Sequence, residues 1–336
     1  MLSEFAILPC VFDESSHCDT DAWRDQLRDL GRGLFPWGGP EPAVVADLYD
    51  GSWTTAVRDC LGHISDHRAK KLCQDLLTQM IRISVKRPPY GRWPEDNLGW
   101  GKEALEGHRL EPFDRVVSAA ATRESLASDF PVLRALEEVE DSGFWRSIRT
   151  TTTPPGDLHE QVGLLRKFCL HAEWIAVINP YGATTELGFV AELFRRAAVR
   201  PEGFSSLSCE LHAQLPKAIH TSSIASPVEN VASNVTGRLA SVLPAGQQCE
   251  VFFWPPFRER RILAGTFAKL ADGIAKKRPR WSIAMTHVAR EGEDDAGRGG
   301  ANWALTQRDD MMKYFDEFVA EAAAKPRFWT ARGMQR

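Results

Sequence analysis

The residues best suited to chemistry lie in the segment FRERR, which runs from Phe257 to Arg261 between two apolar stretches. Arginine carries a planar, permanent positive charge that suits phosphate oxygens. If Arg258 and Arg260 belong to a β-strand, they point to the same side of it, because side chains alternate between its two faces. This pattern predicts an anion site at the end of a strand. A charged turn in water is an equally good interpretation.

A second basic segment, KKRPR, follows between Lys276 and Arg280. The two segments together could form one surface for the backbone of a nucleic acid, either DNA or RNA. The net charge of −4 argues against a protein that coats nucleic acid with its whole surface, but it allows such a local site. The predicted phosphate contacts are Arg258, Arg260, Arg261, Lys276, Lys277, Arg278 and Arg280.

A rival site is centred on His287, at the expected carboxyl end of a strand from Trp281 to Val288. The acidic, glycine-rich stretch that follows contains Asp294 and Asp295. A histidine near carboxylates is suited to general acid–base catalysis, and with a divalent metal ion these groups would form a nuclease or phosphodiesterase site. The pattern favours the simpler interpretation, in which a histidine ends a strand beside a surface loop.

Motifs that many enzyme classes require are missing. The sequence has no GxGxxG after a strand and no GxxxxGK[ST], GxSxG or HExxH. These absences argue against dinucleotide oxidoreductases, P-loop ATPases, serine hydrolases and zinc proteases, so we expect no cofactor and no metal site. Seven cysteines without regular spacing indicate reduced thiols in a cytoplasmic protein. No apolar run approaches the roughly 20 residues that span a membrane.

The chain of 336 residues is long enough for one large domain or two moderate ones. The clearest boundary is the TTTTPPG stretch from Thr150 to Gly156, because its Pro-Pro pair cannot continue a helix. Residues 1–150 show mainly helical spacing after one opening strand. Residues 156–336 alternate between strand and helix patterns, and they predict an α/β sandwich. The fold class is therefore α/β, or α+β over the whole chain.

The second half resembles the degenerate phospholipase D-like domains of bacterial conflict and antiphage-defence systems. The resemblance lies in WIAVINPYG, which looks like their DPY strand and turn, and in CEVFFWPP followed by FRERRILAG, which looks like their HDRyil segment. The closing strand RWSIAMTHV and a terminal helix fit the same order. The first half, with VVADLYDGSW and RPPYGRWP, looks like the helical region that precedes such domains. The resemblance implies a helical N-terminal region and then a phospholipase D-like α/β sandwich.

The HKD motif that makes such domains catalytic is absent. An active site of this type needs H-x-K-x4-D, in which histidine attacks phosphorus and lysine holds the phosphate, and no such string occurs. Arg258 stands where the histidine would be, and arginine cannot attack because its guanidinium stays protonated. The resemblance thus implies a non-catalytic subunit that binds nucleic acid or serves as a scaffold in a bacterial antiphage-defence complex.

The expected partners are other subunits encoded in a defence operon. We expect no membrane partner, and self-association into a homo-oligomer is left open. Two other functions remain as alternatives. One is the metal-dependent nuclease that uses His287. The other is a pure protein-interaction subunit, whose tryptophan-rich first half would dock a partner.

Overall fold

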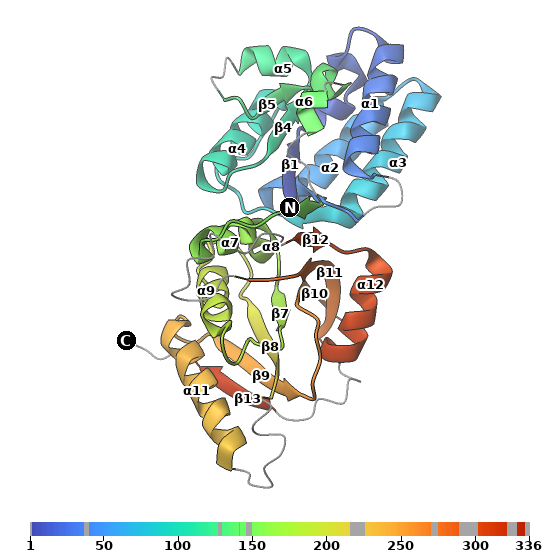
Figure 1. Cartoon of the computed structure of the whole chain (residues 1–336). Helices are drawn as coiled ribbons and strands as arrows, with labels where there is room; N and C mark the ends of the chain where they lie inside the picture. Colours follow the sequence, from blue (N-terminus) through green and yellow to red (C-terminus); the bar gives the residue numbers. More distant parts are fainter. Residues whose placement is uncertain are drawn as a thin grey trace. The chain divides into compact units, whose positions relative to one another are not determined.

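The computed structural model divides the chain into an N-terminal unit, Leu2–Arg149, and a C-terminal unit formed by Thr150–Arg336. Each unit has its own sheet and its own helices (Figure 1). The residues that the structure describes are 2–36, 40–126, 130–140, 142–145, 150–215, 226–269, 275–288, 302–320 and 328–332.

The N-terminal unit is built on a five-stranded parallel sheet in the order β3-β2-β1-β4-β5. Every residue of β1 and β2 is buried, which is typical of a parallel sheet that is covered on both faces. The strands are β1 (Ser3–Ile7), β2 (Ala43–Asp47), β3 (Ser84–Lys86), β4 (Arg115–Ser118) and β5 (Leu133–Ala135).

The N-terminal region is rich in helices, as predicted, but its described residues form five strands instead of the single opening strand of the prediction. The missed strands have only three to five residues, and β2 and β4 are continuous or nearly continuous buried runs. Such runs lack the alternation that identifies a half-buried strand, and their periodicity does not distinguish them from part of a helix.

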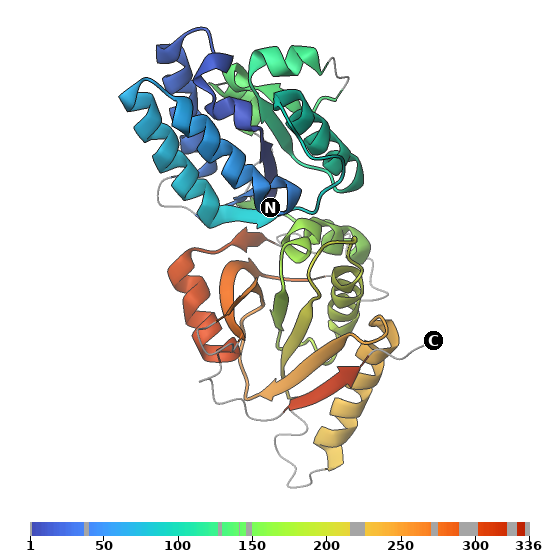
Figure 2. The ribbon, with the colours of Figure 1, turned by 180° about the vertical axis from the view of Figure 1, so that it is seen from behind.

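Helices cover both faces of this sheet. Figures 1 and 2 show α1, α2 and α3 on one side and α4 and α5 on the other, as in a doubly wound α/β fold. The helices are α1 (Thr20–Leu34), α2 (Leu48–His63), α3 (His67–Ile83), α4 (Asn97–Leu110), α5 (Ala120–Ser125) and α6 (Ser142–Trp145), with 3-10 turns η1 (Pro9–Phe12), η2 (Glu14–Ser16) and η3 (Leu136–Glu140).

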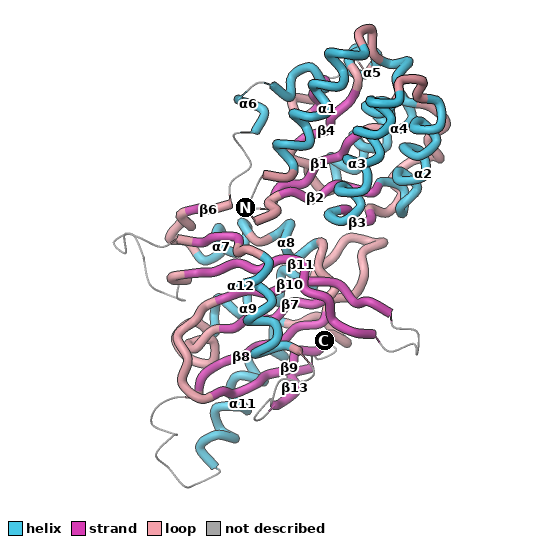
Figure 3. Tube along the Cα trace, turned by 90° about the vertical axis from the view of Figure 1, so that its right-hand side faces the viewer, coloured by secondary structure: helices cyan, strands magenta, loops and turns pink. Residues whose placement is uncertain are grey.

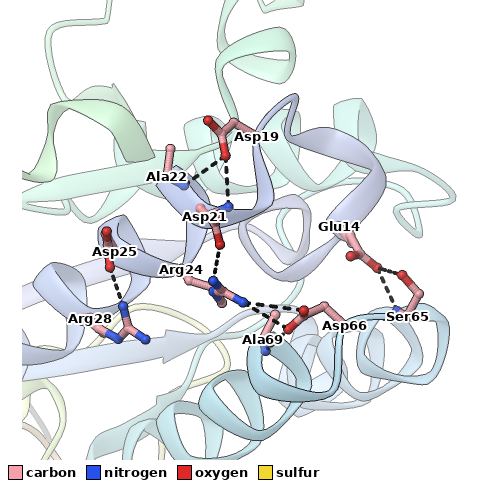
Figure 4. A network of polar contacts seen from close by, with 10 residues as sticks. All are labelled: Glu14, Asp19, Asp21, Ala22, Arg24, Asp25, Arg28, Ser65, Asp66 and Ala69. Atoms are coloured by element: carbon pink, nitrogen blue, oxygen red, sulfur yellow. Dashed lines mark hydrogen bonds and ion pairs between the residues drawn. The ribbon is translucent and has the colours of Figure 1, made fainter.

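Polar contacts at the start of α3 join it to α1 and to the loop after β1 (Figure 4). Asp66 caps α3 by accepting a hydrogen bond from the backbone nitrogen of Ala69 at 2.6 Å, and it also pairs with Arg24 of α1 at 3.4 Å. Glu14 accepts hydrogen bonds from the backbone nitrogen and the hydroxyl of Ser65, at 2.7 and 2.8 Å. These contacts set how α1 and α3 lie side by side.

A fully buried ion pair connects β1 to the segment that follows β3. Arg87 donates from Nε to Oε1 of Glu4 at 2.7 Å and from Nη2 to Oε2, and both side chains are completely inaccessible to solvent. The guanidinium also donates to the hydroxyl of Tyr90 at 3.3 Å and lies 4.9 Å from the ring centroid of Phe113. The pair thus ties the strand at the centre of the sheet to the strand at one edge.

The C-terminal unit contains an eight-stranded mixed sheet in the order β13-β9-β8-β7-β10-β11-β12-β6 (Figure 3). In its centre β7, β8 and β9 are parallel, and β10 is antiparallel to both β7 and β11. The strands are β6 (Thr151–Thr152), β7 (Trp174–Ile178), β8 (Ser208–Gln214), β9 (Gln248–Trp254), β10 (Arg261–Lys269), β11 (Ala275–Met285), β12 (Trp303–Leu305) and β13 (Phe328–Arg332).

The helices of the C-terminal unit lie on both faces of its sheet, with α9 and α11 on one side and α12 on the other (Figure 1). Trp174, Ala176 and Ile178 of β7 pack in one buried cluster with α12 and the turn after it. The helices are α7 (Leu158–Leu164), α8 (Arg166–Leu170), α9 (Leu187–Ala198), α11 (Ser226–Val242) and α12 (Arg308–Tyr314), followed by the π-helical turn η4 (Phe315–Val319). The protein is thus mixed α/β, with one parallel and one mixed sheet.

Within the described ranges, no helix combines the length and the apolar character that crossing a bilayer requires.

The buried pair of Glu4 and Arg87 gives a test of this architecture. The substitution Arg87→Ala leaves a carboxylate without its cation inside the unit, and we expect it to lower the free energy of unfolding by about 3–5 kcal/mol. Arg28→Ala is the control, because Arg28 pairs with Asp25 at the surface and should contribute less than about 1 kcal/mol. Urea unfolding of the full chain measures both, and equal losses would contradict the assignment.

Candidate functional site

The carboxyl ends of β7 and β8 and the start of the antiparallel strand β10 lie at one edge of the C-terminal sheet. Ile178, the last residue of β7, pairs with His212 of β8 and with Arg261, the first residue of β10. Asn179 therefore follows β7, and Arg260 precedes β10, at the same edge. In open α/β sheets, ligands bind at the carboxyl ends of the parallel strands. The FRERR segment thus reaches the edge where a functional site would be expected.

Arg260 is bound to a carboxylate of the protein at this edge. Its Nε and Nη2 donate to Oε2 and Oε1 of Glu186, both at 3.1 Å, and its Nη1 donates to the carbonyl oxygen of Thr286 at 3.0 Å. The guanidinium carbon lies 4.7 Å from the ring centroid of Tyr181. Glu186 is only 1% exposed. The arrangement is a closed, bidentate ion pair. It joins the connection between β7 and α9 to the start of β10, and the bond to Thr286 adds the end of β11.

Asn179 positions the carboxylate of this pair. Its Nδ2 donates to Oε2 of Glu186 at 3.0 Å, while its Oδ1 accepts a hydrogen bond from the backbone nitrogen of Tyr181 at 2.9 Å. Asn179 is fully buried, so the NPYG turn serves as an internal support. The sequence alone does not identify Glu186, because nothing in the local pattern marks a residue just before a helix as the partner of an arginine 74 residues away.

The prediction that Arg258 and Arg260 share one side of a strand was wrong. The strand β10 begins only at Arg261, and residues 255–260 form a connection that starts with two prolines. Proline cannot donate to a β-ladder, so side-chain alternation does not extend through this connection. Arg258 is exposed, and its backbone nitrogen donates to Oε2 of Glu259 at 3.1 Å.

Arg261 is also engaged within the protein. Its Nη1 donates to Oδ2 of Asp310 in α12 at 2.7 Å, and its guanidinium carbon lies 3.7 Å from the ring centroid of Tyr314. The side chain is only 12% exposed. Arg261, the first residue of β10, therefore connects this strand to α12, which covers this face of the sheet.

The second basic segment does not extend the first. In the hairpin of β10 and β11, Lys276 pairs with Ala268 whereas Ala284 pairs with Arg261. Eight residues of strand separate Lys276 from Ala284 and four separate Arg280 from it, so the KKRPR segment lies about 13 to 26 Å along β11 from the position of Arg261. The predicted single surface was wrong because the KKRPR segment is the first half of a long strand instead of a loop before a shorter one.

Lys277 belongs to a buried chain of polar contacts. Its Nζ pairs with Oε1 of Glu210 in β8, whose Oε2 accepts a hydrogen bond from Nε2 of His212 at 3.1 Å. Nδ1 of His212 in turn accepts a hydrogen bond from Nε1 of Trp254 at 3.0 Å. Because the indole can only donate, this pattern places the imidazole proton on Nε2 and leaves His212 neutral. His212 is completely buried and is not available to a substrate.

The remaining cations of the KKRPR segment differ in their surroundings. Lys276 and Arg278 are exposed on the face of β11 opposite to Lys277, and neither forms an ion pair with any residue that the structure describes. The guanidinium of Arg280 lies 4.8 Å from the ring centroid of Trp281. A bulge lies at Gly265 in this part of the hairpin. The position requires glycine, because a Cβ atom there would lie 2.0 Å from the carbonyl oxygen of Arg278.

Only His287 of the rival site lies within the described residues. His287 is exposed just beyond β11, and its carbonyl oxygen accepts a hydrogen bond from Nε1 of Trp303 at 2.8 Å. Asp294 and Asp295 lie outside the described residues. Among the residues that the structure does describe, no three His, Cys, Asp or Glu side chains are grouped so that they could hold a metal ion.

In the N-terminal unit the usual ligand crevice is filled by the chain itself. For this strand order the crevice lies between the loops that follow β1 and β4. The turn η1 lies there with all four of its residues buried. Leu8 donates its backbone hydrogen bond to the carbonyl oxygen of Val117 at 2.8 Å, and Ala119 donates to Sγ of Cys10 at 3.3 Å. The turn η1 and its contacts with the end of β4 therefore occupy the position between these two loops.

No protein-family model and no curated protein matches this sequence.

The two neighbouring arginines should respond differently to truncation. Arg260→Ala leaves the buried carboxylate of Glu186 without its cation, and we expect a loss of about 3 kcal/mol in the free energy of unfolding. Arg258→Ala removes an exposed side chain and should change that free energy by less than about 0.5 kcal/mol. Thermal or urea unfolding of the two variants decides the point, and a comparable loss in both would refute a structural role specific to Arg260.

The thiols provide a second test, because burial makes most of them weak nucleophiles. Burial raises the pKa of Cys60 to about 11 and the pKa values of Cys73 and Cys169 to about 12, while Cys18 is exposed. Only the thiolate reacts with disulfide reagents. At pH 8 we therefore expect one rapidly labelled thiol in the native protein and its loss in Cys18→Ser. Rapid labelling that persists in Cys18→Ser would show a second reactive thiol.

Proposed function

We propose that this protein is a non-catalytic binding and scaffold subunit of a bacterial antiphage-defence complex. In this proposal its C-terminal unit has a phospholipase D-like fold whose former catalytic edge is closed. The order β7, α9, β8, α11, β9, β10, β11 and the position of the NPYG turn beside the FRERR segment support such a fold. The observation that carries the proposal is the ion pair between Arg260 and Glu186 at that edge.

This ion pair disfavours phosphoryl transfer for two reasons. A permanently protonated guanidinium cannot act as the nucleophile. In addition, the carboxylate of Glu186 neutralises Arg260 and would repel an incoming phosphate. The nearest imidazole in β8, His212, is fully buried and is occupied on both ring nitrogens. Arg260, Glu186 and His212 therefore support the fold at this edge, and none of these three described residues is placed to attack or to hold a phosphodiester.

The proposed contact with nucleic acid lies at the far end of the β10–β11 hairpin. Arg260, Arg261 and Lys277 are each bound to a carboxylate, which removes three of the seven predicted phosphate contacts. Lys276 and Arg278 remain exposed on one face of β11, about 6.6 Å apart along the strand. Two such cations attract the phosphate backbone of DNA or RNA without reading its sequence.

A double substitution tests the proposed contact. We expect wild-type protein to bind a fluorescent 20-nucleotide DNA or RNA weakly, and Lys276→Ala with Arg278→Ala to weaken that binding by about tenfold at 50 mM salt and to reduce its salt dependence by about two phosphates. Fluorescence anisotropy over a salt series measures both quantities. Arg258→Ala is the matched control, because it removes one exposed cation at the opposite end of the hairpin and should have a smaller effect.

Three outcomes would contradict the proposal. Binding that is absent in the wild type, or unchanged in the double variant, would remove the nucleic-acid contact. Cleavage of the same oligonucleotides with magnesium or manganese, lost in His287→Ala, would show that the protein is a nuclease instead.

A further inference from the structure

An aromatic corner, formed by the exposed Trp93 and the half-buried Tyr49, lies in the N-terminal unit beyond the ends of β2 and β3. The two rings meet at 89° with their centroids 5.0 Å apart. Trp93 is 57% exposed, whereas every other tryptophan whose burial the structure describes is buried or half-buried. Most of the described tryptophans of the first half therefore belong to the core, and among these Trp93 is the one that a partner could reach.

The loop that carries Trp93 is held in place by a buried carboxylate. Glu103 of α4 is 2% exposed and accepts hydrogen bonds from the backbone nitrogens of Tyr90 and Gly91, both at 2.8 Å. Burial raises the pKa of Glu103, although these two hydrogen bonds oppose the increase. The hydroxyl of Tyr90 is also bound to Arg87 of the buried pair with Glu4. The protein thus uses buried charges to order a surface loop.

The other half of the corner has an unusual backbone. Tyr49, Asp50 and Gly51 all have positive φ, at 54°, 55° and 98°. This conformation is unfavourable for tyrosine and aspartate, and it persists only where neighbouring contacts hold it. Here Asp50 donates its backbone hydrogen bond to the carbonyl oxygen of Arg87 at 2.7 Å. The strained turn presents the ring of Tyr49 to Trp93 in one fixed arrangement.

The charges around the corner indicate the class of ligand. Lys86 is 3.5 Å from Asp50, so these two charges largely cancel. The exposed charged residues that follow in the loop are Arg92, Glu95 and Asp96, which leaves no positive excess. Such a surface does not attract a nucleic-acid backbone, whose binding depends on cations. It suits a polypeptide, for which exposed tryptophan and tyrosine are the usual centres of binding.

We propose that this corner binds an extended, proline-containing segment of a partner protein that also carries an arginine or lysine. A proline ring packs flat on an aromatic face, and an extended proline-rich segment loses little conformational entropy on binding. The exposed carboxylates of Glu95 and Asp96, which outnumber the single cation Arg92 in this loop, complement the basic residue. This inference rests on the scaffold part of the proposed function and not on the contact with nucleic acid.

Synthetic peptides test the proposal with the full-length protein. The probes are ten-residue peptides with two prolines in a P-x-x-P spacing and one arginine at varied positions, and their controls have alanine at each proline. We expect at least one proline peptide to bind with a dissociation constant below about 1 mM, to shift the indole signal of Trp93 in NMR spectra, and to bind tenfold more weakly to Trp93→Ala.

Two further variants separate the corner from general surface effects. Leu110→Ala removes another exposed apolar side chain, 63% exposed, from the same unit and should leave binding unchanged. Glu103→Gln does not touch the ligand but loosens the loop, and it should weaken binding about threefold. Failure of every proline peptide, equal binding of the alanine peptides, or unchanged binding by Trp93→Ala would overturn the proposal. None of these results bears on nucleic-acid binding by β11, so failures of the two proposals are distinguishable.

Discussion

A buried carboxylate is costly unless a cation or several hydrogen bonds compensate it, and three buried carboxylates of this protein determine where three of its basic side chains lie. Glu4, Glu186 and Glu210 are each at most 1% exposed. Their partners come from distant parts of the chain: Arg87 is 83 residues from Glu4, Arg260 is 74 residues from Glu186, and Lys277 is 67 residues from Glu210. Removing either member leaves an uncompensated buried charge, so each pair joins elements that the sequence keeps far apart.

This constraint explains why an arginine-rich segment at a ligand-binding edge has a structural role. The FRERR segment follows β9 and a pair of prolines, and its last two arginines pair with Glu186 and Asp310. A guanidinium that donates to a carboxylate on two nitrogens has little capacity left for phosphate. The closed turn η1 has the same consequence in the other sheet, since it fills the crevice between β1 and β4 with the protein's own apolar side chains. The two edges at which α/β sheets usually bind ligands therefore serve the fold.

Two exposed features then become the most informative about function: the cations Lys276 and Arg278, and the side chain of Trp93. Each of them lies on a backbone that buried contacts support. Lys276 and Arg278 project from a strand whose opposite face is anchored by Lys277 and Glu210. Trp93 projects from a loop whose amides are held by Glu103. In both places, buried charges hold the backbone still while a small number of side chains remain free to make contacts. This division suits a scaffold, which must offer rigid surfaces without a deep pocket.

The sequence alone indicated the α/β character of the second half, the boundary near Thr150 and the absence of cofactor motifs, because strand and helix periodicity and proline pairs act locally. It did not reveal the parallel sheet of the first half, since short buried strands such as β2 show no alternation. Nor could it tell which arginines would be free. That depended on which carboxylates became buried and which cations lay within reach of them, and only the tertiary structure brings Glu186 to Arg260 across 74 residues. The arginines look like a phosphate site because each needs an anion as a partner. For Arg260 and Arg261 the protein supplies that anion itself, as the carboxylates of Glu186 and Asp310.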